Sequence, residues 1–228
     1  MIIDSHTHIF PDKVADTMFA HLLPLAPDDL HAHTDATKKG LLASMKKNDI
    51  DYSVVLPIVT APHQFDSINR FAAKINGHDG LISFGGIHPD NTRIREKLSY
   101  IKSLGLPGVK LHPDDQKTFI DDPRYIEIIR TCVELDLHVT IHAGVDVGFP
   151  DPVYCPPVRA AHMLDLVYGK KHPDKAHITL AHIGGNDLFD EVERCLVGRN
   201  VYFDLAFSLE EENPMIQWLK DHEEPLIY

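Results

Sequence analysis

Residues 138–144 read HVTIHAG, and residues 177–185 read HITLAHIGG. In both stretches a short run of β-branched and apolar residues ends at a histidine, His142 or His182, and a glycine follows two residues later. Such short apolar runs are typical of strands that are buried on both faces of a parallel sheet. The two stretches therefore predict an α/β protein with histidines at the carboxyl ends of its strands.

Five further runs of the same kind predict five more strands. They are MIID at 1–4, YSVVLPI at 52–58, LISFGGI at 81–87, GVKL at 108–111 and VYFDLAF at 201–207. The intervening segments have helical periodicity, with apolar residues at 94, 98 and 101 and at 65, 68, 72 and 75. Asp122 is the expected N-cap of a helix that begins at Pro123, and Asn186 is the expected N-cap of the helix DLFDEVERCL. Alternation of strands and helices predicts a parallel sheet.

The number of strands favours a closed barrel. After the helical stretch EENPMIQWLKDH, the last four residues, PLIY, begin an eighth apolar run, and eight strands close a (β/α)8 TIM barrel. No GxGxxG follows a strand, which disfavours a doubly wound dinucleotide-binding fold. We find no linker or change of composition, so residues 1–228 are expected to form one domain, with the eighth strand cut short at the C-terminus.

Histidine is abundant, with 16 residues, and five histidines lie at predicted strand ends. Active sites of parallel barrels lie at this end of the strands, and residues two apart in a strand face the same side. His6 and His8 should therefore point together, as should Lys110 and His112, with His142 and His182 beside them. Neutral imidazoles that converge in this way fit a divalent ion such as Zn²⁺, which activates a bound water. His88 could be a site residue or a structural one, and His172 is expected on the opposite face.

In this order and spacing, DSHTH, GVKLHPD, TIHAG and LAHIGG resemble the amidohydrolase superfamily over the whole chain. More narrowly, they resemble the branch of metal-dependent TIM-barrel hydrolases that includes aminocarboxymuconate semialdehyde decarboxylase and related nonoxidative decarboxylases. The resemblance implies that His6, His8 and His142 bind one metal ion. It also implies that His182 is the catalytic histidine or, alternatively, a ligand of a second ion.

Two further features bear on this resemblance. Some members of the superfamily carry a carboxylated lysine at the position of Lys110 that bridges two ions, but we favour an unmodified lysine that binds a substrate carboxylate, with His112 beside it. Family members also have an aspartate just after the eighth strand, whereas this sequence stops at PLIY. We therefore expect the 228 residues to be an incomplete barrel.

Composition narrows the class of protein. The net charge of -12 disfavours nucleic acid and anionic membrane surfaces as partners. Three widely spaced cysteines, no signal peptide and no apolar run of membrane-spanning length predict a cytoplasmic protein that acts on a small molecule. A homo-oligomer is left open, because an incomplete barrel would expose strand surface.

The sequence is compatible with three functions. The leading one is a Zn-dependent hydrolase that uses metal-activated water on a small carbonyl compound. The second is a metal-dependent nonoxidative decarboxylase, in which Lys110 holds a carboxylated substrate and His182 delivers a proton to carbon. The third is a noncatalytic metal-binding barrel.

Overall fold

The computed structural model describes residues 1–25, 32–149, 151–169 and 176–208. Its strands follow one another in chain order, and all neighbouring strands are parallel. They form two sheets, of order β1-β2-β3 and β4-β5-β6-β7-β8. The strands are β1 (Ile3–Thr7), β2 (Tyr52–Val55), β3 (Leu81–Ser83), β4 (Gly85–Gly86), β5 (Gly108–Leu111), β6 (His138–Ile141), β7 (Ile178–Leu180) and β8 (Tyr202–Phe203). Because β3 and β4 are both parts of the stretch 81–87, the seven strands expected before residue 208 are confirmed.

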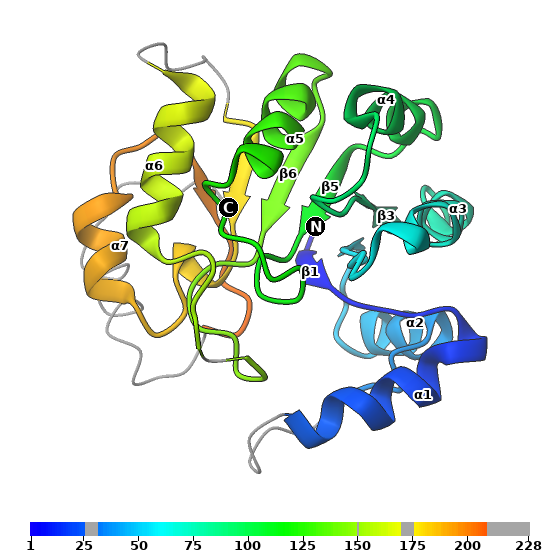
Figure 1. Ribbon diagram of the computed structural model, residues 1–228. Helices are drawn as coiled ribbons and strands as arrows, with labels where there is room; N and C mark the ends of the chain where they lie inside the picture. Colours follow the sequence, from blue (N-terminus) through cyan, green and yellow to red (C-terminus); the bar gives the residue numbers. More distant parts are fainter. Residues whose placement is uncertain (26–31, 150, 170–175, 209–228) are drawn as a thin grey trace.

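Helices surround this central group of strands (Figure 1). They are α1 (Asp12–Leu22), α2 (Lys38–Lys47), α3 (Phe65–Ile75), α4 (Ile94–Ser103), α5 (Pro123–Glu134), α6 (Pro157–Tyr168) and α7 (Phe189–Cys195), with short 3-10 turns η1 (Leu23–Leu25), η2 (Pro62–Gln64) and η3 (His182–Gly184). Helix α1 lies outside the ring, beyond α2, because it is inserted between β1 and the helix that returns to β2.

Most of the local sequence signals act as expected. The periodic residues of α4 at positions 94, 98 and 101 are buried, and the side chain of Asp122 accepts a hydrogen bond from the backbone N–H of Arg124 at the start of α5. The expected cap at Asn186 is wrong, because α7 begins only at Phe189. The Asn186 amide instead donates to the carbonyl of Val145 at 3.0 Å. The Asn186 side chain therefore binds the loop after β6 and does not cap α7.

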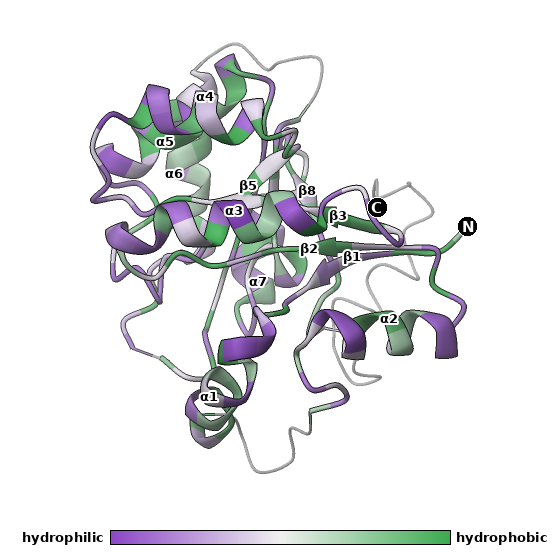
Figure 2. Ribbon diagram, turned by 90° about the vertical axis from the view of Figure 1, so that its right-hand side faces the viewer, coloured by the Kyte–Doolittle hydropathy of each residue, from purple (hydrophilic) through white to green (hydrophobic). Residues whose placement is uncertain are grey.

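The core lies between the strands and the encircling helices. One large cluster includes Val109, Leu111, Val139 and Ile141 of the strands and extends to the buried faces of α3 to α6. A smaller cluster packs α2 against β2 and β3. Each helix carries both hydrophobic and hydrophilic residues, whereas β3 is largely hydrophobic (Figure 2). This pattern is expected when one face of each helix covers a sheet buried on both sides.

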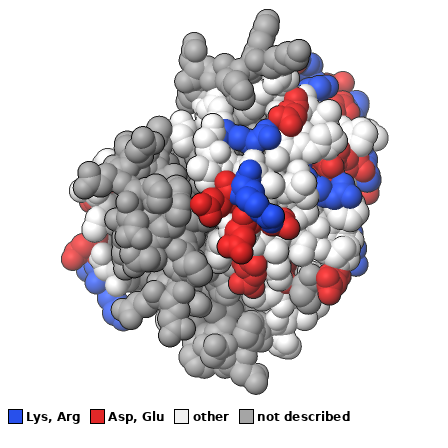
Figure 3. All heavy atoms as spheres, turned by 90° about the vertical axis from the view of Figure 1, so that its left-hand side faces the viewer, with Lys and Arg blue, Asp and Glu red and all other residues white. Residues whose placement is uncertain are grey.

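The described surface shows no patch of a single charge on the side that carries α6 and α7. Basic and acidic side chains lie next to one another there (Figure 3). Arg199, for example, pairs with Asp165 at 2.7 Å. Within the described ranges, no helix is both long and apolar enough to cross a membrane.

Gln116 joins three of the chain segments at the carboxyl ends of the strands. Its amide nitrogen donates to the carbonyls of Val59 and Ile87, each at 2.8 Å. Its amide oxygen accepts from the backbone N–H of His112 at 3.2 Å and from the hydroxyl of Tyr125 at 2.5 Å. All hydrogen-bonding positions of this buried amide are thus filled, and the segments after β2, β4 and β5 are held together.

The glycine of TIHAG permits a close approach of two loops. Gly144 has φ +86°, and a Cβ at this position would lie 2.0 Å from the backbone nitrogen of Asn186. The loops after β6 and β7 form a bridge at these two residues. Only glycine is compatible with both the backbone conformation and the contact.

Three expectations fall on residues outside the described ranges. These are the eighth strand at PLIY, the helix EENPMIQWLKDH before it, and the position of His172.

Candidate active site

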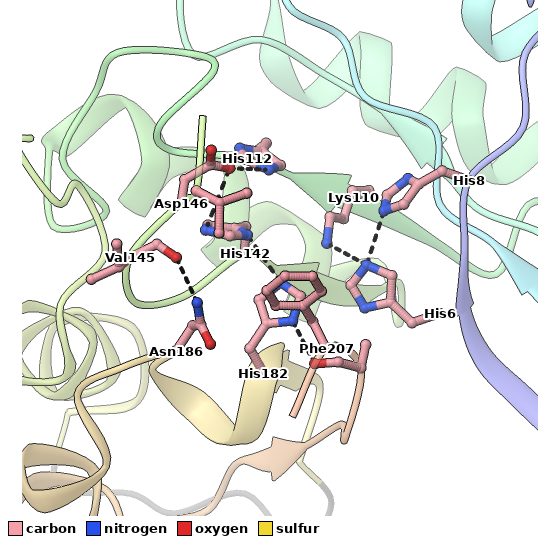
Figure 4. Close-up of a pocket in the computed structure, with 12 residues that line it drawn as sticks. His6, His8, Lys110, His112, His142, Val145, Asp146, His182, Asn186 and Phe207 are labelled. Atoms are coloured by element: carbon pink, nitrogen blue, oxygen red, sulfur yellow. Dashed lines mark hydrogen bonds and ion pairs between the residues drawn. The ribbon is translucent and has the colours of Figure 1, made fainter. Parts of the chain in front are cut away.

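The structure brings all six sequence-predicted site residues into one pocket at the carboxyl ends of the strands (Figure 4). We call this the mouth pocket. Asp146 and Asn186 add polar groups to it, and apolar side chains from two loops form part of its wall. The described lining residues are His6, His8, Lys110, His112, His142, Val145, Asp146, Val147, His182, Asn186, Ala206 and Phe207.

His6 and His8, at the end of β1, direct their Nε2 atoms at each other over 3.0 Å. The Nδ1 atom of His8 lies 2.7 Å from the carbonyl of Leu56, and that of His6 lies 2.8 Å from Oδ2 of Asp204. Since both oxygens are acceptors, each Nδ1 carries the proton and each Nε2 has a lone pair. Two facing lone pairs need a cation or a donor between them, which is the arrangement of metal-binding histidines.

Lys110 is the one cationic side chain among the described lining residues. It is almost completely buried, and its Nζ lies 3.2 Å from Nε2 of His6. Burial lowers the pKa of Lys110 to about 8, against the attraction of Asp204 and Asp115. The group is therefore mainly an ammonium ion at pH 7, placed where water is scarce.

A second set of potential metal ligands lies on the other side of the pocket, after the ends of β5 and β6. Oδ2 of Asp146 is 3.5 Å from Nε2 of His112 and 3.8 Å from Nε2 of His142. One potential ligand atom from each of these three residues lies within 4.8 Å of the others. The rings of His112 and His142 stack with centroids 4.2 Å apart.

Two buried polar atoms beside this set have no hydrogen-bond partner among the described residues. They are Nε2 of His142 and Oδ2 of Asp114, which lie 3.7 Å apart. Leaving such atoms unpaired costs about 1–3 kcal/mol each. A divalent ion would satisfy both, so the donors present here fit the metal that the sequence predicts.

The histidines of the mouth pocket are held in their neutral form. Burial lowers the pKa of His8, His112, His142 and His182, and it lowers that of His6 to about 4. The positive charge of Lys110 acts in the same direction on all five. Neutral imidazoles are the form that binds metal ions and accepts protons.

His182 connects the two sides of the pocket. Its Nδ1 lies 2.7 Å from the carbonyl of Ala206, and its Nε2 lies 3.0 Å from Nδ1 of His142. The backbone at His182 and Ile183 is left-handed, with φ of 59° and 55°. A β-branched residue rarely adopts this conformation, and strain of this kind is concentrated at functional sites.

Sequence reasoning missed three carboxylates of this region. Asp114 and Asp115 follow His112, and burial raises the pKa of Asp114 to about 7 and that of Asp115 to about 6. Asp204 accepts hydrogen bonds from Nδ1 of His6 and from the backbone N–H of His182. Asp114 and Asp115 come shortly after the end of β5, which is the signal that found the histidines, whereas Asp204 lies inside the stretch 201–207 that was expected to be a strand.

Outside the pocket lining lie His88, which the sequence left open as a site residue, and also Arg159 and Cys155. His88 is buried, and its Nδ1 accepts a hydrogen bond from the backbone N–H of Asp90, as expected of a structural histidine. Arg159 pairs with Asp121 at 2.7 Å. Cys155 is fully buried in the core cluster.

Comparison with known proteins agrees with the fold. The family model described as Amidohydrolase matches residues 3–226. The chain therefore belongs to the amidohydrolase family, and it has that family's (β/α)8 TIM-barrel fold. As a member of this superfamily it is a metal-dependent enzyme. No curated protein matches the sequence.

Similar solved structures include decarboxylases and a proposed hydrolase. The apo IDCase of Metarhizium anisopliae is 18% identical with a TM-score of 0.61, over 90% of this chain and 77% of that one. A 5-carboxyvanillate decarboxylase from Novosphingobium aromaticivorans with bound manganese is 17% identical with a TM-score of 0.57, over 81% and 66%. A proposed 2-pyrone-4,6-dicarboxylic acid hydrolase from Pseudomonas putida is 16% identical with a TM-score of 0.53, over 88% and 67%.

Proposed function

We propose that this enzyme is a metal-dependent nonoxidative decarboxylase of a small carboxylic acid. The observation that carries the proposal is the buried ammonium group of Lys110, which lies between the two histidine groups of the mouth pocket. A buried cation is a strong site for a carboxylate, because its field is little screened by water there. The decarboxylases among the similar structures support the same class of reaction.

A divalent ion would supply a positive charge that holds an oxygen of the substrate and stabilises negative charge as it develops. We propose Zn²⁺ as this ion, with Mn²⁺ as the alternative, since a similar decarboxylase contains manganese. We propose His6, His8 and His142 as its ligands. His112 and Asp146 form the competing donor set, which also includes His142.

The chain's own residues account for the rest of the reaction. Lys110 binds and orients the substrate carboxylate, and Val145, Val147 and Phe207 shield it from water. When the carbon–carbon bond breaks, CO₂ leaves and the electron pair stays on the substrate carbon, which then takes up a proton. His182 is the proposed donor of that proton. In the resting enzyme the Nδ1–H is fixed on the carbonyl of Ala206 and Nε2 is unprotonated, so Nε2 first takes up a proton from solvent and then delivers it to the substrate carbon.

Hydrolysis is the second candidate, and it was the leading expectation from the sequence. It is favoured by the similarity to a proposed hydrolase of a dicarboxylic acid. Lys110 would again bind a carboxylate, while His182 would move the proton of the attacking water. Both candidates therefore predict an acidic small molecule as substrate.

Carboxyl-labelled substrates separate the two reactions. We would incubate the purified, metal-loaded protein with a panel of ¹³C-carboxyl aromatic acids and cyclic dicarboxylic esters, and follow the products by ¹³C NMR. Release of labelled CO₂ is expected, and Lys110→Met should abolish it. Ring opening with the carboxyl label retained would establish hydrolysis instead. No turnover of either kind by a protein with its full metal content would contradict both proposals.

The metal ligands can be tested without a substrate. His8→Ala should lower the affinity for Zn²⁺ strongly, because the deleted imidazole is one of only three proposed ligands. His112→Ala tests the competing set, and His63→Ala, an exposed histidine, is the control. Affinity would be measured by competition with a chromogenic chelator. If His112→Ala loses the ion and His8→Ala keeps it, our ligand assignment is wrong.

A further inference from the structure

Asp204, just after β8, bonds to residues on both sides of the mouth pocket. Its side chain is 5% exposed, and one carboxylate oxygen, Oδ2, accepts the Nδ1 proton of His6 at 2.8 Å. The other oxygen, Oδ1, accepts the backbone N–H groups of His182 at 3.0 Å and Ala206 at 3.1 Å. The carboxylate thus contacts one proposed metal ligand and the backbone of the proposed proton donor.

The contact with His6 determines where that ring carries its proton. An ionised carboxylate only accepts hydrogen bonds, so it keeps the proton on Nδ1 and leaves Nε2 of His6 with a lone pair. A carboxylate in this position also raises the basicity of the ring and fixes its orientation. The lone pair points toward Nζ of Lys110 at 3.2 Å and Nε2 of His8 at 3.0 Å, so it faces the neighbouring proposed ligand.

The contact with Ala206 acts on His182 through the backbone. Asp204 holds the turn at residues 204–206, and the carbonyl of Ala206 in that turn accepts the Nδ1 proton of His182. A carbonyl cannot donate, so Nε2 of His182 is also left with a lone pair. One buried carboxylate therefore sets the direction of two imidazoles that come from β1 and from the end of β7.

We propose that Asp204 is a positioning residue that fixes the Nδ1–H tautomers of His6 and His182. Nε2 of each ring is then unprotonated, and it faces His8 and Lys110 in the case of His6 and Nδ1 of His142 in the case of His182. The inference rests on the proposed roles of His6 and His182. It adds a residue outside the predicted ligand set, and it makes a prediction about tautomers that does not depend on any substrate.

The decisive variant is Asp204→Asn, because it changes hydrogen-bonding chemistry with little change of shape. The amide has one acceptor atom and one donor group. The two backbone N–H groups require the amide oxygen on their side, so the NH₂ group faces Nδ1 of His6. That nitrogen must then accept, which moves the His6 proton to Nε2 and removes the lone pair offered to a metal.

A matched control lies elsewhere in the molecule. Asp121 also pairs with a histidine, His162, at 3.0 Å, and it bonds to Arg159, outside the mouth pocket. Asp121→Asn therefore makes the same chemical change to a carboxylate–histidine pair. It should leave the tautomer of His6 and the affinity for metal unchanged.

The test combines two measurements on the full chain. The ¹⁵N shifts of the imidazole nitrogens report the tautomer in metal-free protein, with His6 assigned by the loss of its signals in His6→Gln. We expect the Nδ1–H form in the unaltered protein and the Nε2–H form in Asp204→Asn. We also expect the variant to bind Zn²⁺ about 10- to 100-fold more weakly, by chelator competition.

Each result has a defined meaning. An Nε2–H tautomer of His6 in the unaltered protein overturns the proposal, even if Asp204→Asn does not fold. An unchanged tautomer in a folded variant overturns it as well. If the tautomer changes but the affinity for Zn²⁺ does not, the link to metal binding fails and His6 is not a ligand. If the unaltered protein binds no ion, the proposed function fails while the tautomer measurement still tests Asp204.

Discussion

Replacing Lys110 by methionine should stabilise the metal-free protein and abolish its activity. Lys110 is 1% exposed, and burial lowers its pKa from the usual 10.5 to about 8. At 1.36 kcal/mol for each pH unit, this difference means that keeping the group charged at pH 7 costs about 3 kcal/mol. The lost hydrogen bond to His6 offsets about 1 kcal/mol. Methionine has a similar length, so we expect Lys110→Met to raise the free energy of unfolding by about 2 kcal/mol.

The pH dependence gives this prediction a sharper form. Between pH 8 and pH 10.5 the unfolded chain still binds the Lys110 proton while the folded protein does not, so the stability of the unaltered protein rises with pH. The stability difference from Lys110→Met should therefore shrink across that range and stay constant below pH 7. The five pocket histidines, whose pKa values Lys110 also lowers, titrate below this range because burial holds their pKa values down, so between pH 8 and pH 10.5 they cancel in the difference.

Urea unfolding of both proteins in the presence of a chelator, from pH 6 to pH 10, measures this difference. Tyrosine and tryptophan fluorescence report the transition. A variant that is less stable than the unaltered protein at pH 7, or a difference that does not change with pH, would refute the reasoning that Lys110 is a charged group buried at a cost.

Four other variants test the site and the packing. His182→Asn should keep its metal, by elemental analysis, and lose about 10²- to 10⁴-fold in turnover, because it removes proton transfer; a parallel loss of metal would make His182 a ligand. His142→Ala should lose most bound metal, since both donor sets use this residue, and full retention would exclude both. Gly108→Ala should destabilise the fold by about 1–3 kcal/mol in urea, because a Cβ there lies 2.3 Å from the carbonyl oxygen of His138. Ile128→Ala should cost about 2–5 kcal/mol in the same assay, as the side chain is fully buried between α5 and its neighbours; a change under 1 kcal/mol would mean that this helix packs differently.

The strand ends could be predicted because they depend on local patterns. An apolar run fixes the strand, and the polar residue that ends it marks the functional end of a barrel. From these patterns alone, one end of the barrel was expected to hold His6, His112, His142 and His182, and all four line one pocket in the structure. Alternation within a strand also placed His8 beside His6, and their Nε2 atoms are 3.0 Å apart.

The carboxylates could not be predicted because their roles depend on contacts between distant segments. Asp204 was expected inside a strand over 201–207, but β8 ends at Phe203 because Asp204 turns to bond the backbone of His182. Asp114 is significant only because its Oδ2 atom is buried against His142. The cap expected at Asn186 failed for the same kind of reason, since its amide binds the loop after β6.

The bonds made by Gln116 have a consequence for how the enzyme responds to salt. Its amide joins only uncharged partners, so added salt does not screen these interactions, and the rim formed by the segments after β2, β4 and β5 should keep its shape. The approach of an acidic substrate is different, because the net charge of -12 repels anions from a distance. Raising the ionic strength should therefore speed the arrival of such a substrate while leaving unchanged the frame that receives it.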